Sequence, residues 1–131
     1  MNKHSRKLAS ALQSCAASVE SLSAAIPYFI GVADPPTAPG VYVFVWNDQA
    51  MYVGEAKGSS GLRDRILRKH VAGDEGHALQ RHFMGDFPDR LPRRDYIRRN
   101  VQVKWVVVAN EFVPIVERLA IWLLNPPLNR T

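Results

Sequence analysis

The sequence predicts an α/β domain: a small, mostly antiparallel three-stranded sheet with helices on both sides. One observation is a hairpin pattern, in which the apolar stretches 41–46 and 51–54 are joined by turn-forming residues. A second is the apolar stretch 101–109 (VQVKWVVVA), which predicts the third strand. A third is the apolar spacing of three and four residues before and after these strands, which predicts the flanking helices.

The chain has 131 residues, which fits one domain with one core. We expect an N-terminal helix and linker at 1–38 and the main domain at 39–131. An apolar stripe predicts the helix at 5–26; its residues are Leu8, Leu12, Cys15, Val19, Leu22 and Ile26. The stripe indicates packing against the domain, and a second possibility is pairing with another copy or with a larger protein partner. In that last case the chain would be an assembly component.

Composition limits the setting and the partner. The chain has 17 Lys and Arg against 12 Asp and Glu, a net charge of +5 that suits a polyanion such as nucleic acid. A single cysteine, Cys15, cannot form an internal disulfide, which favours a reducing, cytoplasmic setting. No stretch reaches the roughly 20 apolar residues of a membrane span, so we expect no membrane contact.

Three further segments complete the predicted architecture. A helix is expected at 62–71, with Leu62, Ile66 and Leu67 on its buried face, and another can begin at HALQRHFMGDF. Segment 88–100 contains two prolines and five arginines, which predicts a loop. Segment 111–125 predicts an apolar helix with Pro114 in its first turn. We expect its core face to consist of Ile115, Leu119, Trp122 and Leu123.

An ordered set of motifs runs through the main domain. G-V-Y at 40–42 and Y-V-G at 52–54 lie a hairpin apart, and the segment YVGEAKGSSGLRDRI follows with an arginine on a helix. A helical glutamate then precedes LNPPLN at 124–129. Over residues 39–129 this set resembles the GIY-YIG nuclease family. The resemblance implies a GIY-YIG endonuclease-like fold and a metal-dependent endonuclease that hydrolyses DNA phosphodiester bonds.

The resemblance also implies a role for each site residue. Tyr42 is expected to activate water, and Tyr52 to orient water or phosphate. Arg65 would hold the scissile phosphate, since a guanidinium binds phosphate oxygens through two donors and stays charged. Glu117 would bind the metal, and one carboxylate is enough for Mg²⁺ (or Mn²⁺). His77 is expected to support the reaction.

Other residues surround this predicted site. Gly40, Gly54 and Asn129 are expected to be structural. Glu55 stands where many repair-type members have a lysine, and Lys57, two residues on, matches a lysine common in this loop and compensates in part. This departure leaves open slow or substrate-restricted cleavage and altered metal use.

We expect DNA to be the partner and the chain to be intracellular, at the nucleoid if it acts on DNA. The predicted nucleic-acid contacts are Lys57, Arg63, Arg68, Lys69, His70, Arg93, Arg94, Arg98 and Arg99. The alternative function is a non-catalytic nucleic-acid-binding module on the same fold.

Overall fold

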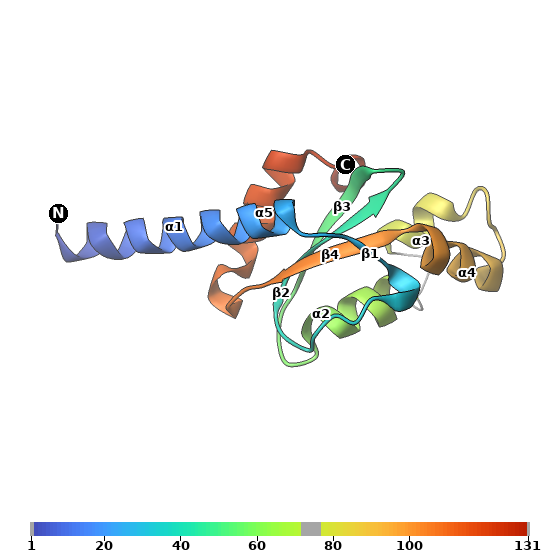
Figure 1. Cartoon of the computed structure of the whole chain (residues 1–131), viewed down its shortest axis with the longest axis horizontal. Coiled ribbons are helices and arrows are strands. Elements are labelled where there is room, and N and C mark those ends of the chain that lie inside the picture. The colour runs from blue at the N-terminus through green and yellow to red at the C-terminus, as the bar shows by residue number, and fades with distance from the viewer. Residues whose placement is uncertain (1, 72–76, 131) are drawn as a thin grey trace.

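The computed structural model describes residues 2–71 and 77–130, with the backbone alone at His70. Its centre is an antiparallel sheet with the strand order β1-β4-β2-β3 (Figure 1). The strands are β1 (Tyr28–Phe29), β2 (Gly40–Trp46), β3 (Gln49–Ala56) and β4 (Gln102–Val107). The predicted antiparallel sheet flanked by helices is confirmed, but the predicted number of three strands is wrong. β1 has only two residues, too few to produce an alternating pattern.

Helices surround the sheet. The longer ones are α1 (Lys3–Ala24), the π-helical η2 (Asp64–Val71), α4 (Arg90–Asn100) and α5 (Val113–Leu124). The shorter ones are η1 (Ile30–Val32), α2 (Gly61–Arg63), α3 (Ala78–Phe83), η3 (Asn110–Phe112) and η4 (Pro127–Asn129). In the described part of the chain, no helix combines the length and the apolar character needed to span a membrane.

Alternation along β2 divides the core between the two faces of the sheet. Val41, Val43 and Val45 pack with residues of α1 and α5. Tyr42 and Phe44 point the other way, toward the apolar residues of η2, α3 and α4. Successive strand residues point to opposite faces, so Tyr42 shares its side of the sheet with the arginine-bearing η2.

The predicted hairpin is confirmed, with β2 and β3 paired from Gly40 and Ala56 to Trp46 and Gln49. Asn47 and Asp48 occupy the turn with φ of 52° and 59°. Two-residue turns of this kind require positive φ at both positions, which Asn and Asp tolerate better than most residues. The turn sets the pairing of Trp46 with Gln49, and a register shift between Phe44 and Val45 then places Tyr52 opposite Phe44 and Gly54 opposite Tyr42.

Helix α1 packs on the domain over only part of its length. Cys15, Val19 and Leu22 are buried, as the stripe predicts. Leu8 and Leu12 continue the stripe but are 61% and 55% exposed, on the half of the helix that projects from the domain (Figure 1). Pairing through this helix stays a prediction.

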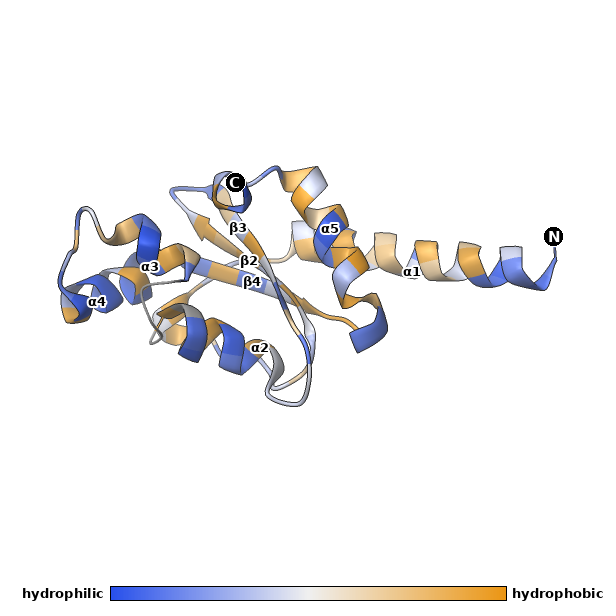
Figure 2. Cartoon of the chain, turned by 180° about the vertical axis from the view of Figure 1, so that it is seen from behind, coloured by the Kyte–Doolittle hydropathy of each residue, from blue (hydrophilic) through white to orange (hydrophobic). Residues whose placement is uncertain are grey.

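The predicted core face of α5 is wrong. Ile115, Leu119, Trp122 and Leu123 are all exposed, and Trp122 is 78% exposed. The buried residues of α5 are Val113, Val116 and Ala120, which lie against the sheet. The helix has apolar residues on several sides (Figure 2), so periodicity alone did not select the face. Smaller side chains allow the closer approach of helix to sheet.

The predicted loop at 88–100 is also wrong, because residues 90–100 form α4. Pro88 precedes the helix and Pro92 is its third residue. Backbone N–H groups in the first turn have no intrahelical acceptor, so a proline there removes no hydrogen bond of the helix. Arg93 and Ile97, one turn apart, form the buried face.

Arg93 is a structural residue. It is 0% exposed; its Nε donates to Gln80 Oε1 and its Nη1 donates to the carbonyls of Phe87 and Pro88, both at 3.0 Å. Gln80 in turn donates to the carbonyl of Val71 at 2.7 Å. The predicted nucleic-acid contact is therefore wrong for Arg93, whose donors tie α4 to α3 and to the end of η2.

Candidate active site

Tyr42 and Gly54 are directly opposite each other in the β2–β3 ladder. Tyr42 is 0% exposed, and its ring lies across Gly54. A Cβ at Gly54 would lie 2.3 Å from both Cζ and the hydroxyl oxygen of Tyr42, closer than atoms can approach. The glycine of Y-V-G therefore makes room for the tyrosine of G-V-Y. This steric relation explains why the two motifs occur together.

Replacing Gly54 by alanine should displace the Tyr42 ring. Overpacking of this kind typically costs about 1–3 kcal/mol, so we expect the free energy of unfolding to fall by that amount. Gly85→Ala is the control, because no atom lies within 4 Å of a Cβ built there. Urea denaturation of the two variants measures the difference, and equal stabilities would contradict the steric role.

The two tyrosines face one environment, with ring centroids 6.5 Å apart. Burial raises the pKa of Tyr42, and the neighbouring Tyr52 raises it further. Burial likewise raises the pKa of Tyr52. The positive charge of Arg65 opposes both shifts, and Arg65 also hydrogen-bonds Tyr42. Both phenols therefore keep their protons at neutral pH unless further positive charge is brought to the site.

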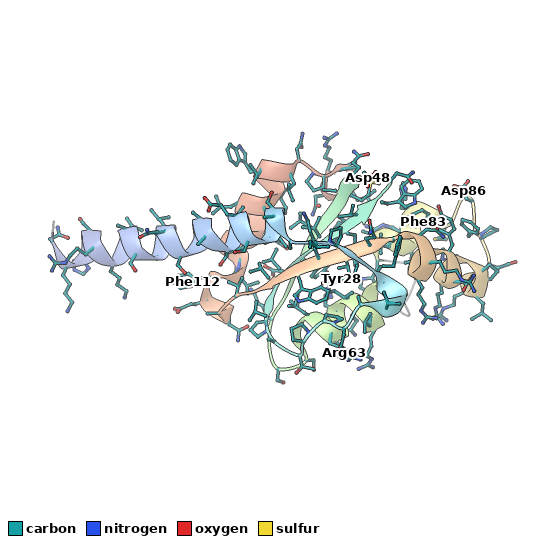
Figure 3. The ribbon with its side chains drawn as sticks, viewed as in Figure 1. Tyr28, Asp48, Arg63, Phe83, Asp86 and Phe112 are labelled. Carbon is teal, nitrogen blue, oxygen red and sulfur yellow. The ribbon has the colours of Figure 1, made fainter. Side chains whose placement is uncertain are left out.

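Arg65 comes from η2, which is anchored by the fully buried Ile66 and, in the preceding α2, by the fully buried Leu62. Its Nε is buried and has no hydrogen-bond partner among the described residues. The neighbouring arginines lie elsewhere: Arg63 pairs with Asp34 at the rim of the molecule (Figure 3), and Arg68 pairs with Asp64 at 3.0 Å. Arg65 thus brings a buried donor and a charge to the tyrosines.

Glu117 reaches the same site from α5, which packs against β3. Burial raises the pKa of the half-buried Glu117 carboxyl, and the negative charge of Glu55 raises it further. Arg118, Lys57 and Arg65 act in the opposite direction. A carboxylate with a raised pKa beside a second carboxylate gains from a bound cation.

Glu55 and Lys57 complete the edge of the site. Lys57 Nζ lies 3.7 Å from Glu55 Oε1. Both residues line a groove of about 340 Å³ together with Asp64 and Arg65. Polar and charged side chains thus dominate this groove, which suits an ionic ligand.

Asn129 fastens β3 from outside the sheet. Its Oδ1 accepts from the N–H of Val53 at 2.7 Å, and its Nδ2 donates to the carbonyl of Val53 at 2.8 Å. These bonds occupy edge groups of β3 that no neighbouring strand uses. Because Val53 lies between Tyr52 and Gly54, Asn129 holds the backbone that positions the tyrosines.

The predicted supporting role of His77 stays a prediction. His77 is the N-cap residue of α3 and is half-buried. The positive charge of Arg81, on α3, partly opposes the rise in the pKa of Tyr52. Sequence reasoning missed Arg81, although its position one turn after His77 placed it on the same helical face. The side chain of His70 lies outside the described residues, so its predicted contact stays a prediction.

The donor set fits a hard divalent cation. In the described part of the chain, no three His, Cys, Asp or Glu side chains form a metal-binding group. Glu117 and Glu55 still offer two neighbouring carboxylates. Mg²⁺ retains most of its waters and commonly takes only one or two protein carboxylates.

The comparisons with known proteins were made on sequence and on structure. No family model and no curated protein matches the chain. The fold is similar to a crystal structure of the GIY-YIG N-terminal endonuclease domain of UvrC from Thermotoga maritima, a point mutant bound to its catalytic divalent cation. The identity is 22% and the TM-score 0.49, covering 78% of this chain and 91% of that chain. The chain is thus similar to a GIY-YIG domain over most of its length.

Proposed function

We propose that this chain is a divalent-metal-dependent endonuclease that hydrolyses DNA phosphodiester bonds. The observation that carries the proposal is the convergence of Tyr42, Tyr52, Arg65 and Glu117 from β2, β3, η2 and α5. Far apart in sequence, these groups are close enough in the fold for the charges of Arg65 and Glu117 to act on the pKa of both tyrosines. Phosphodiester hydrolysis requires an activated water, neutralisation of phosphoryl charge and help for the leaving oxygen, and two phenols, a guanidinium and a metal-binding carboxylate can meet these needs.

Each side chain has a distinct task in this proposal. Arg65 donates to the phosphoryl oxygens, for which its buried Nε is already available. Added positive charge would lower the pKa of Tyr42, so that the phenol releases its proton to solvent and the phenolate can then accept a proton from the attacking water; Tyr52 orients that water. Glu117 holds Mg²⁺, which when bound supplies Lewis-acid stabilisation of phosphoryl charge and of the leaving oxygen.

The alternative, a non-catalytic nucleic-acid-binding module, is favoured by two features. Tyr42 is fully buried and its pKa is raised, which opposes its action as a base. Glu55 stands where many repair-type members of the GIY-YIG family have a lysine. Its negative charge contributes to the raised pKa of Tyr52. For Tyr42 to act as a base, a cation bound at Glu117 would have to lower the pKa of Tyr42.

A plasmid-nicking assay separates the two functions. With Mg²⁺ or Mn²⁺, the wild-type chain should convert supercoiled plasmid to nicked circles. Arg65→Gln should lower the rate about 100-fold or more, the usual effect of removing one donor to transition-state charge. Arg6→Gln removes the same charge from α1, outside the site, and should cleave at the wild-type rate. Absence of nicking by the wild type, with DNA binding intact, would favour the binding module.

A further inference from the structure

Helix α4 has the largest net positive charge of any element of the chain. Helix α4 contains five arginines and one aspartate, a net charge of +4, whereas the whole chain has +5. The remaining 120 residues carry 12 Lys and Arg against 11 Asp and Glu, a net charge of only +1. The candidate active site combines Lys57 and Arg65 with Glu55 and Glu117, so it adds no net charge. Helix α4 is therefore the strongest candidate for attracting a polyanion.

Three of these arginines form a row, which we call the arginine ridge: Arg90, Arg94 and Arg98. They are spaced by four residues on α4, so they lie on one helical face at steps of about 6 Å. Burial lowers the pKa of Arg94, and the charges of Arg90 and Arg98 lower it further. Like charges at this spacing each destabilise a helix by about 0.2–0.5 kcal/mol. A row of them favours an anionic partner.

The ridge stands on a fixed support. On its buried side, Arg93 and Ile97 are 0% exposed, and the hydrogen bonds of Arg93 fasten α4 to α3. Arg99 lies off the ridge and pairs with Asp95 at 3.0 Å. Helix α4 is largely hydrophilic in Figure 2 and lies at the end of the molecule opposite the projecting α1 (Figure 1). The three guanidinium groups are therefore presented by a rigid helix.

We propose that the arginine ridge binds the phosphate backbone of DNA and supplies most of the affinity for the substrate. This inference rests on the proposed function, since it names the surface that holds the nucleic acid being cleaved. Cations in a straight row suit the regularly spaced phosphates of one strand. A membrane surface fits less well, because a helix that lies on a membrane exposes its apolar face, and that of α4 is buried in the domain.

The ridge is also placed to serve the active site. Helix α4 packs against η2, the element that carries Arg65. Lys69 is exposed on η2, and Arg68 is exposed there with its partner Asp64. Helix α4 thus adjoins an element that has two exposed cations and also carries Arg65. In this proposal the strongly basic arginine ridge binds DNA, and the nearly neutral candidate active site cleaves it.

The test is DNA binding by the double variant Arg90→Gln/Arg98→Gln. Fluorescence anisotropy with a labelled 20-base-pair duplex at 50, 100 and 200 mM salt gives Kd and its salt dependence. We expect Kd to rise about tenfold or more and the salt slope to fall by about 2, one unit per lost phosphate contact. The control Lys3→Gln/Lys7→Gln removes two exposed cations from α1 and should bind as the wild type does.

Other readouts separate the possible failures. Circular dichroism establishes that both variants are folded. A wild-type Kd and salt slope in the ridge variant would overturn the proposal. So would loss of binding to phosphatidylserine vesicles by the ridge variant with no change in DNA binding. If the wild type fails to cleave but binds DNA through the ridge, the proposed function is overturned and the ridge is not.

Discussion

Replacing Glu117 by glutamine is expected to abolish cleavage and to make the protein more stable. The carboxylate is half-buried, and its pKa is raised by desolvation and by the charge of Glu55. Glutamine keeps the shape and removes the charge. We expect the free energy of unfolding at neutral pH to increase by about 0.5–1 kcal/mol, as at other sites where function is kept at the cost of stability. Cleavage should fall at least about 100-fold.

The stability gain should depend on pH with a defined sign. The pKa of Glu117 is higher in the folded chain than its ordinary value of 4.5, so folded protein binds the proton more tightly. Well below that value both states are protonated, and wild type and Glu117→Gln should differ little. As pH rises through the raised pKa, the wild type should lose stability relative to the variant.

Thermal unfolding at several pH values measures this difference. The control Glu111→Gln removes an exposed carboxylate from η3 and should show no such trend. If Glu117→Gln were less stable than the wild type at pH 7, the inference that the Glu117 carboxylate destabilises the fold would be wrong.

Replacing Arg93 by methionine should destabilise the protein by about 3 kcal/mol. The change leaves Gln80 Oε1 and the carbonyls of Phe87 and Pro88 without their donor, and a buried polar group without a partner costs about 1–3 kcal/mol. Met fills part of the space, so the loss is mainly that of hydrogen bonds. Urea denaturation measures the effect.

The matched comparison is the double variant Arg93→Met/Gln80→Met, which removes donor and acceptor together. Because the two residues share one network, the double variant should lose less stability than the sum of the single variants. DNA affinity of Arg93→Met below its unfolding transition should equal that of the wild type. A large loss of affinity in the folded variant would restore Arg93 as a DNA contact.

Local sequence signals predicted the hairpin and the place of the main elements. Asn47 and Asp48 identified the turn, and the apolar alternation before and after it identified β2 and β3. Proline rules worked for Pro114, which lies in the first turn of α5. The same rules misled at Pro92, because a proline that ends one helix can equally begin another. The many arginines around Pro92 also made the short buried face of α4 impossible to recognise from the apolar pattern.

The arrangement of the site was only partly predictable. Motif order identified Tyr42, Arg65 and Glu117, but their closeness depends on how β3, η2 and α5 pack, which no local pattern contains. The Tyr42 ring lies over Gly54 because the strand register places the two residues opposite each other. Arg93 has a structural role because the packing of α4 buries it. The charge of Arg81 acts on the pKa of Tyr52 only because the fold brings α3 near this tyrosine. Each is a tertiary fact rather than a sequence pattern.

Cleavage started by Mg²⁺ in a preformed protein–DNA complex tests the central claim most directly. Wild type and Glu117→Gln are each bound to end-labelled duplex in excess protein without metal, so that affinity does not limit the rate. After Mg²⁺ is added, the wild type should nick the bound DNA in a single turnover, and Glu117→Gln should bind equally well and leave it intact. Nicking by Glu117→Gln at the wild-type rate would contradict the account.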